Sequence, residues 1–368
     1  MTKIKTIDPT TLKDWLAKGK SVTVLDIRPD NERQEWFIPQ STHFNVFDQL
    51  KSGDKHALDS LNIDKEIPVV TVCAGGNLSQ VAAEILSEKG YDAYSLEGGM
   101  KAWNYAWDTS EIILDDVKII QVRRVAKGCL SYLVGSGNQA MVIDASLDPS
   151  VYEELAKEQG WSIDYVADTH IHADYVSRTR ELAKAQGAKH VMIESAAVEF
   201  QFTPLKDGEN IQIGNVNIKV LHTPGHTWES SSFLIANKVI FTGDTLFTDS
   251  VGRPDLKASE EEAKNKAAAL YDSLQVLLSL NKETLVMPAH NSAPIKIGQA
   301  LISAPITEIE NSIQSLALDK EQFIRSILSK LPESPPNYLT IAAINKSGDS
   351  KDFIIADLEA GANHCAIK

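Results

Sequence analysis

Four apolar, strand-like runs in this chain each end beside residues that can bind a metal ion. The first run, residues 163–168, leads into the loop 169–175, with the sequence THIHADY. A helix is expected over residues 176–186, with Gly187 as its stop signal. In a loop, side chains two positions apart can turn toward one ion, whereas a regular strand would send them to opposite faces. Nitrogen and oxygen donors of this kind suit Zn(II) or Fe(II).

Three later stretches repeat this pattern. The strand-like run 216–221 precedes a tight Pro-Gly turn that ends at His226. A second apolar run ends at Asp244, and a third ends at His290. A single His-x-His pair in a loop is usually surface decoration. Four strand ends that each present a metal-type ligand favour a metal site instead.

Together these stretches resemble the metallo-β-lactamase superfamily, over roughly residues 114–300 and with the four motifs in the family's order. The resemblance implies an αββα sandwich, which three short strands over residues 117–144 would open. Cys129 lies within one of these strands, so we expect it to pack in the core. Asp144 ends another strand and either supports the metal loop or caps a turn.

The N-terminal part, residues 1–110, alternates strands and helices, which predicts a small parallel α/β domain. A helix bearing Trp103 and Trp107 is expected to close it, with a junction at residues 109–111. The second domain is then expected over residues 114–368, including a helical and extended C-terminal extension over residues 301–368. The fold class is therefore α/β, with the parallel-sheet domain first and the sandwich second.

Cys73 ends an apolar strand and opens a glycine-rich turn into a helix. Backbone N–H groups of such a turn and the helix N-terminus favour a thiolate, which is the nucleophilic form of cysteine. The alternative is a buried structural cysteine. We interpret Cys73 as a sulfur carrier and the following residues as its sulfur-binding loop: Ala74, Gly75, Gly76, Asn77, Leu78 and Ser79.

The segment resembles a single-domain rhodanese, carried by Asp26-Ile27-Arg28, by the Cys73 loop and by residues 96–103, LEGGMKAW. By this resemblance Cys73 would carry a persulfide. The chain departs from the family because Ala74 and Leu78 stand where many active rhodaneses place arginines. A dianionic donor such as thiosulfate would lose its charge partners there. Persulfide handling with another donor, or a docking role, stays open.

The second domain looks like the persulfide dioxygenases, which oxidise a thiol persulfide with O2 and are often fused to rhodanese domains. The resemblance maps that family's iron ligands onto His170, His226 and Asp244. Two His and one Asp form the facial triad of non-haem Fe(II) oxygenases, so one iron per chain is expected. The remaining motif residues would orient ligands and water through hydrogen bonds: His172, Asp174, Tyr175 and His290.

Tyr175 bears on the metal count, because a dinuclear hydrolase needs a histidine directly after Asp174. A phenol that titrates near ~10 is a poor neutral ligand. The main alternative is a Zn-dependent thioester hydrolase of the glyoxalase II type, which would hold two metals. A second alternative is a sulfur-responsive binding protein that has lost catalysis.

Composition limits the other partners. The net charge is −14 and neither half is basic, so nucleic acid and anionic membranes are not expected to bind. No apolar run approaches the ~18 residues of a membrane span. The three cysteines, Cys73, Cys129 and Cys365, are far apart, which indicates a reducing, cytoplasmic setting. The expected partners are a small-molecule thiol persulfide and O2, and a homodimer stays open.

Overall fold

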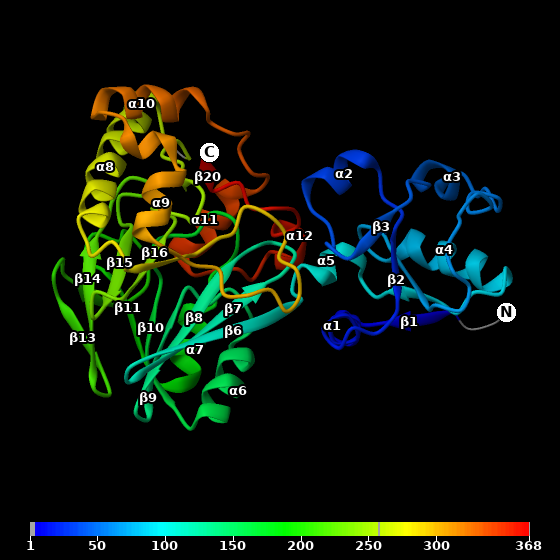
Figure 1. Ribbon diagram of the computed structural model, residues 1–368, viewed down its shortest axis with the longest axis horizontal. Coiled ribbons are helices and arrows are strands. Elements are labelled where there is room, and N and C mark those ends of the chain that lie inside the picture. Colours follow the sequence, from blue (N-terminus) through cyan, green and yellow to red (C-terminus); the bar gives the residue numbers. More distant parts are fainter. Residues whose placement is uncertain (1–3, 257, 368) are drawn as a thin grey trace.

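The computed structural model describes residues 4–256 and 258–367, and it places a smaller N-terminal domain beside a larger second domain (Figure 1). The N-terminal domain is built on a five-stranded parallel sheet in the order β1-β5-β4-β2-β3. Its central strands are buried on both faces, as parallel strands between helices are. The elements are β1 (Lys5–Ile7), α1 (Pro9–Ala17), β2 (Thr23–Asp26), α2 (Asp30–Glu35), β3 (Ser41–His43), α3 (Phe47–Lys51), β4 (Val69–Val72), α4 (Asn77–Glu88), β5 (Ala93–Leu96) and α5 (Gly99–Trp103).

The second domain consists of two sheets packed face to face. The first has seven strands in the order β12-β11-β10-β9-β8-β7-β6 and the second has six in the order β13-β14-β15-β16-β18-β19. The strands are β6 (Trp107–Leu114), β7 (Val117–Arg124), β8 (Leu130–Ser136), β9 (Gln139–Ile143), β10 (Ser162–Ala167), β11 (Lys189–Ile193), β12 (Thr203–Leu205), β13 (Asn210–Ile213), β14 (Val216–His222), β15 (Ser231–Ile235), β16 (Val239–Gly243), β18 (Leu285–Pro288) and β19 (Ala304–Pro305). A separate small pair joins β17 (Val251–Gly252) to β20 (Ala366–Ile367), antiparallel.

Helices cover the outer faces of both sheets. The seven-stranded sheet packs against α6 (Pro149–Gln159) and α7 (Thr179–Gln186), and the six-stranded sheet packs against α8 (Glu260–Leu278), on which α10 (Lys320–Ser329) lies. The remaining helical elements of this domain are α9 (Ile306–Ser312), the 3₁₀ turn Gln314–Ala317, α11 (Tyr338–Ser347) and α12 (Ile355–Leu358). The layers are therefore helix, sheet, sheet and helix, which confirms the predicted αββα sandwich and the α/β class.

The domain boundary lies closer to the N-terminus than the sequence analysis predicts. The residues expected to form a junction, 109–111, lie inside β6, which pairs with β7 along its whole length. Trp107 begins this strand, so it does not belong to the helix that contains Trp103. The second domain therefore begins before residue 110. A strand that enters a new sheet without a polar linker leaves no compositional signal of the boundary.

The helix after the metal loop also begins later than expected, at Thr179 instead of residue 176. The backbone N–H of Val176 donates to Glu359, and that of Ser177 donates to Asn345. Both acceptors belong to the C-terminal part of the chain, so distant residues hold these two positions in the loop. Gly187 ends the helix in a left-handed conformation, as predicted.

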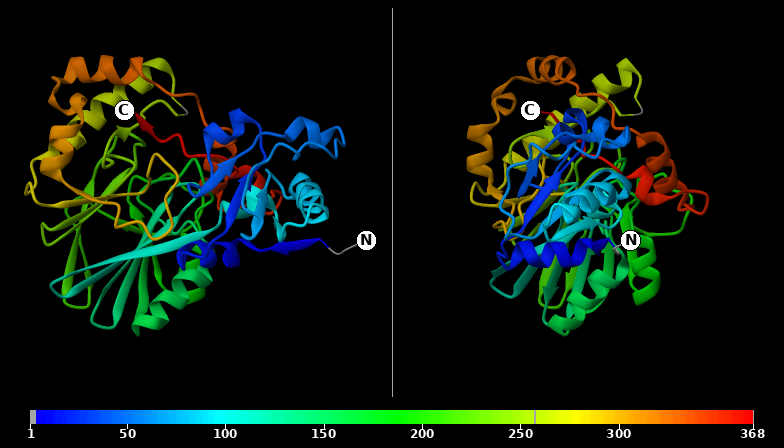
Figure 2. Two further views of the ribbon diagram at one scale, coloured as in Figure 1. Left: turned by 45° about the vertical axis from the view of Figure 1, so that its right-hand side comes forward. Right: turned by 90° about the vertical axis from the view of Figure 1, so that its right-hand side faces the viewer.

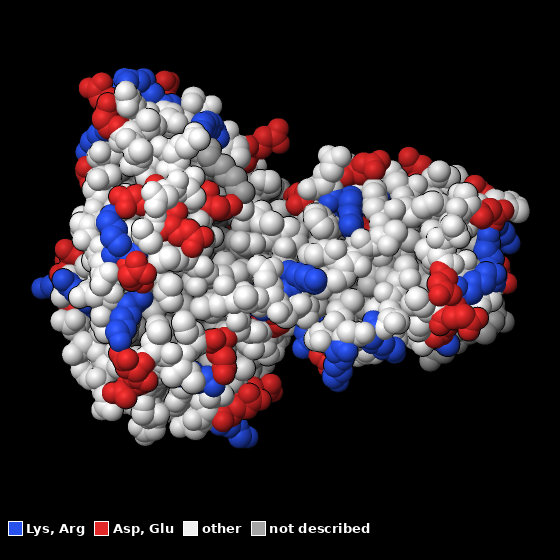
Figure 3. All heavy atoms as spheres, in the orientation of Figure 1, with Lys and Arg blue, Asp and Glu red and all other residues white. Residues whose placement is uncertain are grey.

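The C-terminal segment bridges the two domains (Figure 2). Helix α12 lies beside α5, and Lys101 pairs with Asp357 at 2.7 Å. Beyond α12, strand β20 returns to the second domain. On the face drawn in Figure 3, acidic and basic side chains are interspersed over both domains. Among the helices of the described residues, none combines the length and apolarity of a membrane span.

Candidate metal centre

Three predicted ligand residues meet at one edge of the sandwich. His170 follows β10, His226 follows β14, and Asp244 comes directly after β16. The Nε2 atoms of His170 and His226 each lie 3.6 Å from Oδ2 of Asp244. Ligand atoms bound about 2.0–2.2 Å from one ion are roughly 3–3.6 Å apart. The spacing therefore fits a single metal ion.

Hydrogen bonds on the far side of each ring set the tautomer of the two histidines. The Thr169 hydroxyl donates to Asp144, so it accepts from Nδ1–H of His170 at 2.9 Å. Nδ1–H of His226 donates to the backbone carbonyl of Arg253 at 2.8 Å. Each Nε2 therefore presents a lone pair to the centre. Burial lowers the pKa of both imidazoles, which keeps them neutral.

The carboxylate of Asp244 supplies the negative charge. Asp244 is 1% exposed, and its Oδ2 atom has no hydrogen-bond partner among the described residues. Burial opposes ionisation, but the neighbouring His290 holds the pKa of Asp244 well below its usual range. A buried anionic oxygen without a donor is costly unless a cation sits beside it. The three side chains thus fit a divalent metal ion.

His290 and Asp174 lie next to this group. Nδ1 of His290 is 2.7 Å from Oδ1 of Asp244, and its Nε2 is 2.9 Å from Oδ2 of Asp174. Burial works against protonation of His290, but the two carboxylates raise its pKa well above the usual value. In this arrangement His290 orients Asp244 through a hydrogen bond.

His172 and Tyr175 turn away from the three ligand atoms. Nε2 of His172 is 3.2 Å from Asp144 and 2.9 Å from the Tyr175 hydroxyl, and the two rings stack at 4.3 Å between centroids. The Tyr175 hydroxyl also donates to the backbone carbonyl of Asp144 at 3.3 Å. Asp144 itself accepts from the Thr169 backbone N–H, so it supports the metal loop, the first of the two roles considered for it.

Two cysteines lie at the metal centre, and the local sequence pattern did not predict this position for either of them. Cys129 is fully buried, as expected for core packing, but its sulfur is 3.7 Å from Asp174. Cys365 lies beside Asp244 and His290. Burial and the nearby carboxylates raise the pKa of both thiols, so both stay protonated. Only the tertiary fold brings Cys365 here, because it stands 121 positions after Asp244.

Two polar residues of the C-terminal segment also hold the metal loop. The Asn345 amide donates to the carbonyls of His172 and Tyr175, at 2.8 Å and 2.7 Å. Glu359 is 1% exposed and pairs with Arg124 at 2.9 Å while accepting from Val176. Neither residue stands in a recognisable motif, so the sequence offered no signal for them.

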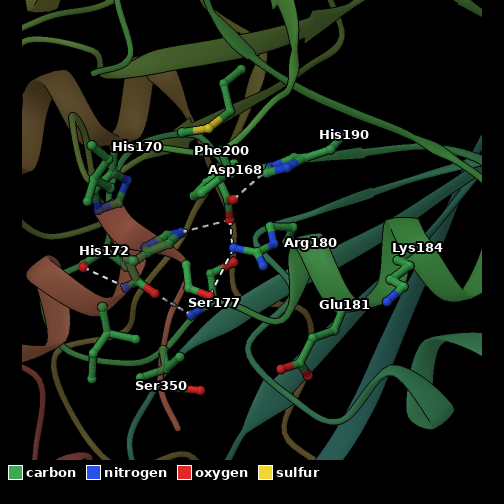
Figure 4. Close-up of a pocket in the computed structure, with 16 residues that line it drawn as sticks. Asp168, His170, His172, Ser177, Arg180, Glu181, Lys184, His190, Phe200 and Ser350 are labelled. Carbon is green, nitrogen blue, oxygen red and sulfur yellow. Dashed lines mark hydrogen bonds and ion pairs between the residues drawn. The ribbon is translucent and has the colours of Figure 1, made fainter. Parts of the chain in front are cut away.

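A cavity of about 200 Å³ lies beside the metal loop, between β11, α7 and α11 (Figure 4). Asp168 accepts hydrogen bonds there from Ser177, Thr179 and His190. His172 reaches the same carboxylate at 3.7 Å. This network joins the loop to the start of α7.

The Cys73 loop lies in the N-terminal domain, apart from the metal ligands. Backbone N–H groups of Gly76 and Ser79 donate to the Cys73 sulfur at 3.2 Å and 3.4 Å. The other four loop residues, Ala74, Gly75, Asn77 and Leu78, make no hydrogen bond to the sulfur in the described structure. Gly99 packs so closely that a β-carbon there would collide with the Cys73 carbonyl, so the turn requires glycine.

Two different protein families match the two domains of the chain. A family model for the metallo-β-lactamase superfamily matches residues 124–290, and one for the rhodanese-like domain matches residues 8–106. A hydroxyacylglutathione hydrolase of Methylococcus capsulatus is 30% identical over 219 residues, which are 55% of this chain and 80% of that protein.

Two solved structures share much of the architecture. A metallo-β-lactamase from Staphylococcus aureus subsp. aureus COL has a TM-score of 0.58 at 26% identity and covers 64% of this chain and 74% of its own. ETHE1 from Myxococcus xanthus has a TM-score of 0.54 at 26% identity and covers 66% of this chain and 99% of its own. The chain therefore belongs to the metallo-β-lactamase superfamily and carries a rhodanese-like domain ahead of that fold.

Proposed function

We propose that this protein is a persulfide dioxygenase with one non-haem Fe(II) per chain, held by His170, His226 and Asp244. The overall reaction is RSSH + O2 + H2O → RSH + SO3²⁻ + 2H⁺. The observation that carries the proposal is the position of Tyr175. Its hydroxyl is bound to His172 and Asp144, so the residue after Asp174 offers nothing to a second metal. Two histidines and one carboxylate leave coordination positions open for substrate.

The chain's own residues prepare this site in three ways. Thr169 and the Arg253 carbonyl hold the two imidazoles with Nε2 toward the centre. His290 fixes one oxygen of Asp244, which leaves the other oxygen for the ion. The ligands are 1–2% exposed, so bulk water is excluded from the reacting atoms. Fe(II) bound there would supply the redox chemistry through which O2 oxidises the outer persulfide sulfur.

The rhodanese-like domain would transfer sulfur through Cys73 or serve as a docking domain. Two backbone N–H groups already point at its sulfur, an arrangement that stabilises a thiolate or a terminal persulfide anion. The loop offers no arginine for a dianionic donor. We therefore assign Cys73 to persulfide handling and not to thiosulfate turnover.

Metal analysis and O2 uptake test the proposal together. Protein purified without added metal should contain about one iron per chain, because two histidines and one carboxylate are the donor set that binds a single Fe(II). It should consume O2 with glutathione persulfide and release sulfite. Two zincs per chain at full occupancy, with no O2 uptake from the iron-loaded protein, would contradict the proposal.

A Zn-dependent thioester hydrolase is the second candidate. The relative named hydroxyacylglutathione hydrolase favours it, because that protein shares 30% identity with this chain over 80% of its own length. Asp174 and His290 also lie next to Asp244 of the first site, where a second metal could share that carboxylate. Cleavage of a glutathione thioester that requires two metals per chain would support this candidate over the dioxygenase.

A further inference from the structure

A second cavity, of about 180 Å³, opens directly beside the ligand His226. Ile171 of the metal loop forms part of its wall, and Trp228, which is 45% exposed, forms another. Helix α8 contributes Glu262 and Lys266 to the wall, and helix α11 contributes Ala342 and Lys346. A residue of the C-terminal extension therefore faces a space that adjoins the metal centre.

Helix α11 is held firmly enough to position a side chain. Asn345 binds two carbonyls of the metal loop and accepts from the Ser177 backbone N–H at 2.9 Å. Ile341 and Ile344 pack against Val176. Residues four apart on a helix share a face, so Ala342 and Lys346 point together into this cavity. Asn345 instead lines the cavity of Figure 4, which places α11 between the two spaces.

Four charged side chains line the cavity: Glu229, Glu262, Lys266 and Lys346. Glu262 accepts from the Trp228 indole at 3.2 Å, and Glu229 accepts from the Ile171 backbone N–H at 3.0 Å. Lys266 is 5% exposed and donates to the Leu256 carbonyl at 3.4 Å. The exposed ammonium group of Lys346 makes no ion pair within residues 4–256 and 258–367.

We infer that Lys346 is a specificity-determining residue that selects a small carrier thiol bearing a carboxylate. This inference rests on the proposed function, since it names the carrier whose persulfide reaches the metal centre. The sulfur end of the carrier would lie toward His226, and its carboxylate would meet the Lys346 ammonium. An ammonium paired with a carboxylate makes a charge-assisted hydrogen bond, stronger than a neutral one. A carrier without charge gains nothing from this residue.

Steady-state O2 uptake with two carriers tests the assignment. Glutathione persulfide carries carboxylates, whereas the persulfide of N-acetylcysteamine carries none. Lys346→Glu should raise KM for the first roughly tenfold, as expected for one lost charged hydrogen bond, and leave its kcat unchanged. KM for the uncharged carrier should stay the same. Lys346→Arg should behave like the unmodified protein, because it keeps the charge.

Lys351→Glu is the matched control. Its side chain is 87% exposed, belongs to the same C-terminal segment and does not line this cavity. The same change of charge there should leave both KM values unchanged. Equal effects of Lys346→Glu on both carriers would mean a structural role, and no effect on either would place the carrier elsewhere. Both results overturn the inference.

Calorimetric titration with the free thiols separates this inference from the proposed function. Glutathione should bind the unmodified protein more tightly than N-acetylcysteamine, and Lys346→Glu should remove the difference. If no persulfide supports O2 uptake, the proposed function fails, while the titration still decides the role of Lys346. Equal affinity of the two thiols for the unmodified protein would overturn the inference whatever the activity.

Discussion

At the scale of single residues, the centre depends on hydrogen bonds that aim the ligand atoms. Thr169 and the Arg253 carbonyl orient the two histidines, and His290 orients Asp244. Each ligand thus has one side fixed by the protein and one side left for the ion. Such supporting contacts affect affinity less than the ligands do, typically by about 10–100-fold.

The contrast between Asp244 and His290 can be measured. Asp244→Ala should abolish iron binding, because it removes the only anionic ligand of the triad. His290→Ala should weaken binding by about 10–100-fold without abolishing it. Elemental analysis after dialysis against a chelator series checks both variants. If His290→Ala loses iron as completely as His226→Ala, then His290 is itself a ligand.

Under the proposed function Tyr175 leaves the site with one metal ion, which leads to a second prediction. Tyr175→His should raise second-metal occupancy, since a histidine there could join Asp174 and His290 around another ion. The Tyr175 phenol is 0% exposed and stacks on His172. The imidazole of the variant must therefore also turn out of the space that the phenol fills. Zinc content per chain of the variant, compared with Tyr175→Phe, is the measurement. Equal zinc in both variants would show that position 175 does not control the count.

At the scale of elements, the turn between β4 and α4 places Cys73 in the N-terminal domain, whereas the metal ligands belong to the second domain. Cys73→Ser should abolish sulfur labelling of the N-terminal domain and leave O2 uptake with a small-molecule persulfide nearly unchanged. Thiosulfate:cyanide transfer should be weak even in the unmodified protein, because no loop arginine binds the dianion. A collapse of O2 uptake in Cys73→Ser would mean that persulfide must pass through the first domain.

Strand β2 ends in a buried charge cluster that makes the first domain sensitive to acid. Burial raises the pKa of Asp26, but hydrogen bonds and charge from Arg28 and Arg33 outweigh it and lower the pKa overall. The ionised carboxylate therefore stabilises the fold above its unfolded pKa of about 3.9, and this contribution is lost as pH falls through the lower folded value. Relative to Asp26→Asn, the unmodified protein should gain a constant margin above about pH 5 that shrinks below pH 4. Urea unfolding across pH, followed by circular dichroism, measures this margin.

At the scale of the whole molecule, the C-terminal segment joins both domains to the metal loop. The Glu359 carboxylate binds Arg124 and Val176, and its carbonyl accepts from Asn104 and Lys127. Nearby, His364 lies 4.0 Å from Glu35 of the first domain. The extension is therefore an integral part of the structure and not an appended tail.

Removing the Glu359 charge should destabilise the whole assembly. Glu359→Gln would leave Arg124 buried without its ion pair, which typically costs about 3–5 kcal/mol. The exposed pair between Lys101 and Asp357 is a suitable control, because Asp357→Asn should cost less than about 1 kcal/mol. Thermal unfolding midpoints of the two variants provide the comparison. Equal midpoints would show that the buried pair does not stabilise the fold.

The sequence by itself determined the order of the domains and the residues that could hold a metal, whereas the sandwich was implied by the resemblance to the metallo-β-lactamase superfamily. These features rest on local patterns: apolar runs of strand length and ligands at the residues that follow them. Because a strand end fixes where the next side chain stands, short motifs could be placed in the fold before the fold was known.

Only the tertiary structure decided how those residues are used. It turned Tyr175 and His172 away from the ligand atoms and extended β6 across the expected domain junction. It also brought Asn345, Glu359 and Cys365 to the metal loop from far along the chain. Contacts between distant segments depend on packing, charge pairing and the satisfaction of buried polar groups, and these leave no periodic pattern in the sequence.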